Sequence, residues 1–591
     1  MSGLSLGACD GRDFCRSSIR DSTIGINFDA LGEVEHYEHV SGDLFDLLKS
    51  GEHTDVTFVV GGVRFPVHRV ILASRCTFFS VLLFGDMREA QPGNNEITLQ
   101  DATPESFRAL LEYIYSGKVC LGDLPEQVIL DLLGLSNKYD FSHLQSSILA
   151  YLKATLSVHN ACIIYNVANF YQLSDLCLAC ASYIDINAQA VMRSEAFLSI
   201  SHQSLVELVS RTSFYCPELE VYFGIRRWLD NNEVSKDEEK NILKIVRLEL
   251  IPMSSLLGEV RESSLFEAND ILDAIAMINK KNMIELNQRG LLLPEENVAT
   301  VQHDATVSDN QTILLSGDTE SYTGDHGYAI HTITRNGPSK GIIVGLNQPY
   351  IINCIKMLLW DRDNRSYSYY IEISLDGSQW LTIIDRRDHL CRSWQELFFE
   401  DKVVKYIRII GTFNSMNRSF HLVSFSCLHT SRRFSLSKDG LIIPDENVAS
   451  ISTSATVLEG VSRSRNALLN GNTRDYDWDS GYTCHQLGSG YIIIQLAQPY
   501  VISTMRLLLW DCDDRSYSYY IEVSTDQKSW TKVIDRSQES CRSWQHIQFD
   551  PLPVTFVKIV GTHNTANEVF HCVHFECPAA PLSSSPNNHF N

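Results

Sequence analysis

The sequence is short of positive charge. Its 591 residues include 49 lysines and arginines against 72 aspartates and glutamates, which gives a net charge of −23 at pH 7. A nucleic-acid-binding protein needs clustered lysine and arginine to neutralise phosphates, and docking on an anionic membrane by bulk charge needs the same surplus. The composition therefore argues against both functions.

Long apolar runs and a secretory signal are also lacking. No stretch of 18 apolar residues is present, so we expect no transmembrane helix. Residues 1–20 contain no apolar core of a signal peptide. The 16 cysteines are therefore expected to be free thiols of a cytoplasmic protein, mostly buried. The one close pair, Cys177 and Cys180, has no second pair of the kind that a zinc site needs, and its surroundings predict a buried helix.

Catalytic and metal-binding motifs are missing as well. The sequence has no GxSxG nucleophile elbow, no GxxxxGK[ST] phosphate loop, no HExxH helix and no paired CxxC set of a RING finger. His571, Cys572, His574 and Cys577 lie close together in the sequence. Side chains alternate along a strand, however, so these four would not converge on one ion, and we expect no metal site. We predict a protein that is not an enzyme and needs no cofactor.

An internal repeat fills the C-terminal half. RSYSYYIE at 365–372 recurs at 515–522, and the offset of 150 residues extends to the ends of both copies. Each copy contains short runs of Ile, Val, Tyr and Leu that are separated by turn residues. This pattern predicts two all-β domains of the sandwich or jelly-roll type, at residues 286–430 and 436–578.

The N-terminal half follows different patterns. Alternating apolar residues on both sides of Gly61-Gly62 predict a β-hairpin. Next to it, His68 is expected to be a core histidine with its hydrogen bonds satisfied. Thr103-Pro104 begins a helical stripe of apolar residues that Gly117 closes, which predicts a capped helix.

The remaining segments are helical or aperiodic. From residue 156 to about residue 278 the apolar residues keep a helical spacing, with short polar breaks. The leader at 1–32 and the tail at 579–591 are polar and aperiodic, so we expect both to be disordered.

Several of these segments resemble known domain families. DVTFVVGGVRFPVHRVILASRCTFFSVLL, from Asp55, and TPESFRALLEYIYSG, from Thr103, resemble a BTB/POZ domain, expected at 33–145. LSVHNACIIYNVANFYQLSDL and PELEVYFGIRRWL are similar to the BACK helical domain, expected at 146–285. SYYIEVSTDQKSW and KYIRIIGT resemble discoidin, or coagulation-factor five/eight C-terminal, domains. The resemblance implies a multidomain fold with an α/β BTB domain, an all-α BACK domain and two all-β discoidin-like jelly rolls.

The BTB–BACK resemblance implies a substrate adaptor of a cullin-3 ubiquitin ligase. Met87 and Glu89 match the apolar-x-Glu motif by which such adaptors hold cullin-3, and Tyr115 matches a further contact position. The alternative for the motif is a solvated turn. The family also implies a BTB homodimer, with Asp55 and Arg69 as a charged pair at the interface. From the residues alone, this pair could form a partly buried ion pair across the hairpin or simply maintain the fold.

Each repeat also carries a charged, turn-like segment that begins with a tryptophan. Loops of this kind bind ligands in jelly rolls, so the resemblance implies ligand-binding loops, although a purely structural role explains the pattern equally well. In that alternative, Trp510 closes the core and Arg515 bridges Asp511. The expected loop residues are Trp360, Asp361, Arg365, Tyr476, Trp478, Trp510, Asp511 and Arg515.

Two functions follow as hypotheses. In the first, the protein is a dimeric, non-catalytic adaptor whose BTB domain holds cullin-3 and whose paired jelly rolls bind an unknown protein substrate. In the second, it is a cullin-independent scaffold whose BTB dimer presents the jelly rolls to a protein, glycan or lipid. Loss of cullin-3 capture with Glu89→Arg would separate the two.

Overall fold

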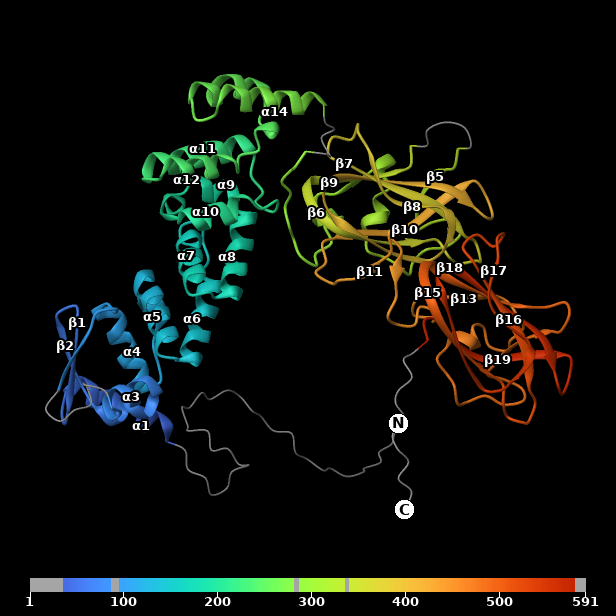
Figure 1. Cartoon of the computed structure of the whole chain (residues 1–591), viewed down its shortest axis with the longest axis horizontal. Coiled ribbons are helices and arrows are strands. Elements are labelled where there is room, and N and C mark those ends of the chain that lie inside the picture. Colours follow the sequence, from blue (N-terminus) through green and yellow to red (C-terminus); the bar gives the residue numbers. More distant parts are fainter. Residues whose placement is uncertain (1–35, 87–94, 281–285, 335–339, 580–591) are drawn as a thin grey trace, which may run out of the picture. The chain divides into compact units, whose positions relative to one another are not determined.

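The computed structural model describes residues 36–86, 95–280, 286–334 and 340–579. The chain divides into two compact units, Met1–Tyr151 and Leu152–Asn591, which are described one at a time (Figure 1).

A three-stranded sheet with flanking helices makes up the first unit (Figure 1). In the strand order β2-β1-β3, β1 pairs antiparallel with β2 and parallel with β3. Gly61 and Gly62 have positive φ angles of 53° and 82°, as a two-residue hairpin turn requires, and the predicted hairpin is confirmed. The elements are α1 (Tyr37–Ser50), β1 (Val56–Val60), β2 (Val63–Val67), α2 (Arg69–Arg75), α3 (Thr77–Phe84), β3 (Glu96–Leu99), α4 (Pro104–Ser116), α5 (Glu126–Lys138) and α6 (Ser142–Ala154), which runs across the boundary between the units.

Helix α4 begins and ends where the sequence predicts. The Thr103 hydroxyl accepts a hydrogen bond from the Ser106 amide, and Pro104 occupies the first turn. Gly117 ends the helix with a φ of 70° and donates its amide to the Tyr113 carbonyl. The buried side of α4 places Phe107 against the sheet, where its ring lies near the rings of two strand residues, Phe58 and Phe65.

The second unit begins with helices, as the periodicity predicts. They are short and joined by brief turns, and most of them bury apolar side chains. The buried Trp228 side chain also donates its indole N–H to the Ile200 carbonyl, which satisfies its polar atom. The helices are α7 (Ala161–Phe170), α8 (Ser174–Ile186), α9 (Ala188–Arg193), α10 (His202–Val209), α11 (Glu218–Asn231), α12 (Lys236–Leu243), α13 (Met253–Ser255) and α14 (Ala268–Lys280).

The two repeats form all-β domains, which confirms the predicted class (Figure 1). Their strands pair in matching order. The first sheet has the order β5-β10-β6-β9-β7-β8, and β4 pairs with β6. The second sheet repeats these neighbours through β14, β19, β15, β18, β16 and β17, with β13 on β15 and a short β11-β12 ribbon added at one edge.

The strand bounds are close to identical in the two copies. The first has β4 (Thr306–Val307), β5 (Ala329–Thr332), β6 (Ile342–Leu359), β7 (Tyr367–Ser374), β8 (Leu381–Cys391), β9 (Trp394–Asn414) and β10 (Ser419–Leu428). The second has β11 (Ser435–Leu436), β12 (Ile442–Ile443), β13 (Thr456–Glu459), β14 (Thr483–Gln486), β15 (Ile492–Leu509), β16 (Tyr517–Ser524), β17 (Thr531–Cys541), β18 (Trp544–Asn564) and β19 (Val569–Glu576).

Hydrogen bonds join the first jelly roll to the second. The Glu396 amide donates to the Gln498 side-chain carbonyl at 2.9 Å, and the Gln498 side-chain amide donates back to the Glu396 carbonyl at 2.9 Å. The Ala497 carbonyl accepts both the Arg392 amide and the Gln395 side-chain amide. Gln395 and Gln498 are buried, so losing a partner would leave an amide unsatisfied. These hydrogen bonds therefore resist a change in the way the two jelly rolls pack against each other.

Candidate functional site

Of the three residues expected to contact cullin-3, Tyr115 lies in the described part of the chain. Met87 and Glu89 fall outside the described residues, just beyond α3, which ends at Phe84. Tyr115 lies on α4 and is buried, and its hydroxyl accepts the His68 amide at 2.9 Å. Burial raises the pKa of Tyr115 to about 12. In the single chain, Tyr115 therefore supports the hairpin and presents little surface to a partner.

His68 is a satisfied core histidine, as expected. Its side chain is buried, and Nδ1 lies 2.8 Å from the Tyr115 hydroxyl. Nε2 lies 2.8 Å from the Glu52 carbonyl. Both ring nitrogens therefore have partners within the domain, and a ligand-binding role is not needed to explain the residue.

Asp55 and Arg69 do approach each other, but not in the expected way. The Asp55 carboxylate accepts the backbone amide of Arg69 at 2.8 Å, at the first turn of α2. The Arg69 guanidinium donates to the Leu83 carbonyl at 3.1 Å, on α3. Within one chain, Asp55 thus stabilises the start of a helix, and Arg69 joins two helices. Their role at a dimer interface stays a prediction.

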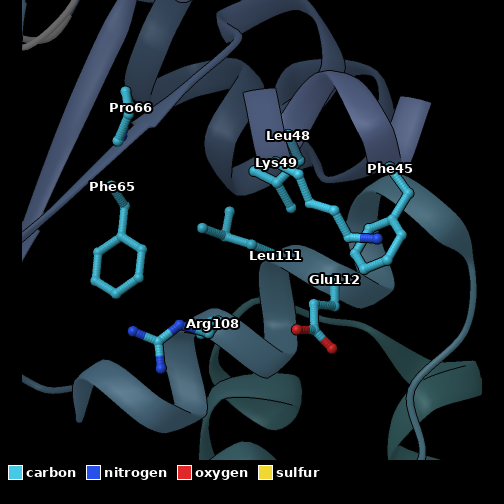
Figure 2. A pocket seen from close by; sticks show the side chains of 8 residues that line it. All are labelled: Phe45, Leu48, Lys49, Phe65, Pro66, Arg108, Leu111 and Glu112. Carbon is cyan, nitrogen blue, oxygen red and sulfur yellow. The ribbon is translucent and has the colours of Figure 1, made fainter. Parts of the chain in front are cut away.

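A hollow of about 240 Å³ lies between α1, β2 and α4 (Figure 2). Figure 2 shows Leu111 near the centre, with Phe65 and Phe45 on opposite sides. Arg108 and Glu112, both from α4, place charged groups at its edge. Helix α1, which contributes Phe45, Leu48 and Lys49 to this hollow, has no fully buried side chain in one chain.

Exposed apolar side chains are frequent in the first three helices of the same unit. Tyr37 and Val40 on α1 are 73% and 59% exposed. Val70 on α2 and Val81 and Phe84 on α3 are also exposed. These side chains lie on three helices that follow one another in the sequence, and grouped apolar side chains of this kind mark interaction surfaces more often than single exposed ones do.

The tryptophan-led loop of the first jelly roll is held by internal contacts. Trp360 is buried and donates its indole N–H to the Thr323 carbonyl. Arg365 stacks over the Trp360 ring at 3.9 Å and forms a two-bond ion pair with Asp363. That pair lowers the pKa of Asp363, chiefly through its hydrogen bonds to Arg365. Asp361 accepts the hydroxyl of Tyr322 at 2.5 Å.

The second jelly roll repeats this arrangement. Trp510 is buried, and Arg515 stacks over its ring at 4.3 Å. Arg515 pairs with Asp513, whose pKa is lowered to about 2, mainly by hydrogen bonds from that guanidinium. The expectation that Arg515 bridges Asp511 is therefore wrong. Asp511 instead accepts the Tyr476 hydroxyl at 2.5 Å, so its carboxylate already has a partner.

Trp478 is the loop residue that remains accessible. Its side chain is 62% exposed, and its ring lies 4.6 Å from the Trp510 ring. The first jelly roll has Gly324 at the equivalent position, so this aromatic surface belongs to the second copy. For the other loop residues, the contacts favour the structural alternative, and a ligand-binding role of the loops stays a prediction.

Three arginines near these loops were not among the site residues expected from the sequence. Arg362 and Arg392 belong to the first jelly roll and Arg465 to the second, and they line one hollow. Arg362 stands in the tryptophan-led segment, but no local motif marks Arg392 or Arg465, because Arg465 lies more than a hundred residues after Arg362. The signal available in the sequence was a difference between the repeats: Arg362 stands where the second copy has Cys512.

The described ranges were also searched for membrane-spanning helices, disulfides and metal-binding groups. No helix in them combines the length and apolar character needed to cross a membrane. Their cysteines are free thiols, and no group of three or more His, Cys, Asp or Glu residues there is placed to hold a metal ion.

Three segments of the chain match known domain families. Residues 44–156 match the BTB/POZ domain, 161–261 match the domain described as "BTB And C-terminal Kelch", and 449–575 match the F5/8 type C domain. These matches confirm the multidomain fold class.

Similarity also extends over nearly the whole chain. BTB/POZ domain-containing protein 9 of Homo sapiens is 52% identical over 563 residues, which cover 95% of this chain and 91% of the relative. The Mus musculus protein of the same name is 52% identical over 93% of this chain and 90% of its own length. That of Drosophila melanogaster is 44% identical over 92% of this chain and 74% of its own length. The chain therefore belongs to the BTB/POZ domain-containing protein 9 family.

Proposed function

We propose that this protein is a dimeric, non-catalytic, cytoplasmic adaptor of a cullin-3 ubiquitin ligase. The observation that carries the proposal is the domain order, because a BTB domain followed by a BACK domain is typical of cullin-3 adaptors. All of its domains belong to types that usually mediate interactions rather than catalysis. The ubiquitin-transferring components would then come from the partners.

The self-association part of the proposal rests on the first unit. Tyr37 and Val40 are exposed on α1, and α1 has no fully buried side chain in one chain. A second copy, packed on α1 and its neighbouring helices, would bury this apolar surface. Dimers of this kind commonly bury more than roughly 2,000 Å² of mostly apolar surface. The occupant proposed here is thus another copy of the chain.

The cullin-3 contact is proposed for Met87 and Glu89. An apolar side chain can enter a greasy pocket, and a carboxylate two residues later can meet hydrogen-bond donors at the pocket rim. The paired jelly rolls would then bind the protein to be ubiquitinated. Discoidin-like domains are binding modules, which supports this division of labour.

The test is capture of purified cullin-3 by the full chain and by two variants, Met87→Ala and Glu89→Arg. Truncating a hot-spot residue typically costs about 2 kcal/mol or more, which is roughly a thirty-fold loss of affinity. Glu89→Arg should weaken binding further, because it places a positive charge where donors are expected. Unchanged capture by both variants would favour the cullin-independent scaffold.

A further inference from the structure

A polar hollow of about 470 Å³ opens where the two jelly rolls meet. We call it the inter-roll pocket. The first jelly roll contributes Asp361, Arg362 and Arg392 to its wall, and the second contributes Ser454, Arg465 and Asn466. The pocket sits beside the hydrogen bonds that fix the two jelly rolls together, and Arg392 takes part in both through its amide and its side chain.

Arg392 is the buried cation of the pocket. Its side chain is 5% exposed, and its Nη2 donates to the carbonyls of Asp361 and Asp363 at 3.1 and 3.0 Å. Its buried Nε has no hydrogen-bond partner among the described residues. Burial lowers the pKa of Arg392; nearby Asp361 opposes this shift, and nearby Arg465 adds to it. A buried N–H without an acceptor is costly, so the Arg392 side chain is one acceptor short.

The other two arginines are not neutralised either. Arg362 stacks over the Tyr322 ring at 4.0 Å and donates to the Glu320 carbonyl, a neutral acceptor. Arg465 is exposed, and its guanidinium has no hydrogen-bond or ion-pair partner in the described part of the chain. Against three guanidiniums the pocket holds one carboxylate, that of Asp361. The inter-roll pocket is therefore positive in a protein whose net charge is −23.

The second repeat shows that the fold does not require this charge. At the position of Arg362 it has Cys512, and at the position of Asn364 it has Asp514. The counterpart of Arg392 is Arg542, which donates to the same two loop carbonyls. Arg542 is exposed, however, and lies 3.6 Å from the Asp514 carboxylate. The same loop is thus built without an uncompensated cation, and the positive charge of the first copy needs another explanation.

We propose that the inter-roll pocket binds the phosphorylated side chain of a peptide. This proposal rests on the proposed function, in which the jelly rolls bind a protein substrate, and it names the chemistry that they recognise. Guanidinium groups match the geometry of phosphate oxygens and bind them through paired hydrogen bonds. Clusters of arginine are a recurrent means of recognising phosphorylated segments.

The charge of the whole protein favours a peptide over a polymer of negative charges. Nucleic acid, a sulfated glycan or an anionic membrane carries many charges, and holding it takes a broad surplus of lysine and arginine, whereas the chain as a whole has a net charge of −23. A single phosphorylated side chain needs only the recessed pocket. Ser454 and Asn466 add a hydroxyl and an amide to the wall, which can donate further hydrogen bonds to phosphate oxygens.

The test measures binding of the full chain to a fluorescent library of short peptides. Each peptide carries phosphoserine, phosphothreonine or phosphotyrosine at one fixed position between degenerate flanks, and a phosphatase-treated aliquot serves as the unphosphorylated probe. The key variant is Arg465→Glu, because Arg465 is exposed and its side chain makes no contact that the fold needs. The matched control is Arg474→Glu, since Arg474 is exposed on another loop of the second jelly roll. Arg362→Glu is the second pocket variant.

We expect the phosphorylated library to bind and the treated library not to bind. Affinity should fall about tenfold or more with Arg465→Glu and with Arg362→Glu, because each removes a charge-assisted contact, and it should not change with Arg474→Glu. Binding should also weaken as salt rises. The proposal is overturned if the library does not bind, if phosphate makes no difference, or if all three variants weaken binding equally.

Heparin and phosphatidylserine vesicles are tested beside the peptides. If they bind through Arg465 while the peptide library does not, the pocket serves a polyanion, and the proposal is wrong. Cullin-3 capture is measured on the same preparations. Normal capture without phosphopeptide binding contradicts the pocket alone, whereas phosphopeptide binding without capture contradicts the adaptor function alone.

Discussion

Glu218 and Arg289 form an ion pair that is sealed from water. Arg289 Nε donates to Glu218 Oε2 at 2.6 Å and its Nη2 donates to Oε1 at 3.1 Å, with 3% and 1% of the two side chains exposed. Arg289 also donates to the Val209 and Arg211 carbonyls, and Glu218 accepts the Arg247 amide. The pair therefore ties the start of α11 to the segment that leads into the first jelly roll.

Replacing Glu218 should destabilise the second unit strongly. Glu218→Gln keeps the shape of the side chain but leaves Arg289 as a buried charge without its counter-ion. Breaking a buried pair from one side typically costs roughly 3 to 5 kcal/mol. We expect a lower midpoint for the corresponding transition in thermal unfolding of the full chain, followed by calorimetry.

The same helix provides the control. Glu220 lies two residues further along α11 and pairs with Arg193, whose side chain is 62% exposed. An exposed pair contributes little because solvent screens it. Glu220→Gln should therefore leave the midpoint nearly unchanged. Equal effects of Glu218→Gln and Glu220→Gln would show that the buried Glu218–Arg289 pair stabilises the second unit no more than an exposed pair does.

Acid should destabilise both jelly rolls through two equivalent histidines. His421 and His571 lie at the same position of the repeat, each with Nδ1 3.2 Å from a tyrosine hydroxyl, and burial lowers the pKa of both to about 4. An unfolded histidine titrates near 6.5. Between about pH 6.5 and 4 the unfolded chain binds protons that the folded chain does not, so stability falls as the pH falls through this window.

The histidine effect can be measured as the slope of the thermal midpoint against pH in this window. His571→Gln should make the slope for the second jelly roll shallower, since the substituted side chain does not titrate. His546→Gln, at an exposed position of the same jelly roll, should leave the slope unchanged. A slope that His571→Gln does not alter would assign the acid sensitivity to other groups.

The cysteines should react according to their burial. Cys120 and Cys512 are exposed, whereas Cys427 and Cys577 are fully buried, and burial raises the pKa of both buried thiols. Iodoacetamide applied to the native protein should therefore alkylate Cys120 and Cys512 and spare the other two until the chain is unfolded. Peptide mass spectrometry reports each site. A native disulfide that contains Cys427 or Cys577 would contradict the predicted free thiols.

Features with local signals could be predicted from the sequence. The hairpin turn at Gly61-Gly62 and the ends of α4 at Thr103 and Gly117 depend on residues next to one another in the chain. The two jelly rolls were visible because the sequence repeats itself. In both cases, the residues that determine the structure lie within the segment itself.

Contacts between distant segments could not be predicted in this way. Arg515 pairs with Asp513 and not with Asp511, because Asp511 is taken by Tyr476, which lies 35 residues upstream. The Glu218–Arg289 pair joins residues 71 positions apart. Arg392 and Arg465 meet only because two domains pack together. None of these partners is marked by spacing or composition.

A charge on α1 should separate dimer formation from cullin-3 binding. Val40 is exposed in the single chain, so Val40→Glu should leave the monomer folded. If a second copy covers α1, the substitution buries a carboxylate without a partner at the interface, which is strongly unfavourable. Sedimentation of the full chain should then show the monomer mass. Glu89 follows α3 in the sequence and does not belong to α1, so we expect Glu89→Arg to sediment as a dimer while losing cullin-3. A dimer that survives Val40→Glu would show that α1 is not its interface, and a wild-type monomer would contradict the proposed self-association itself.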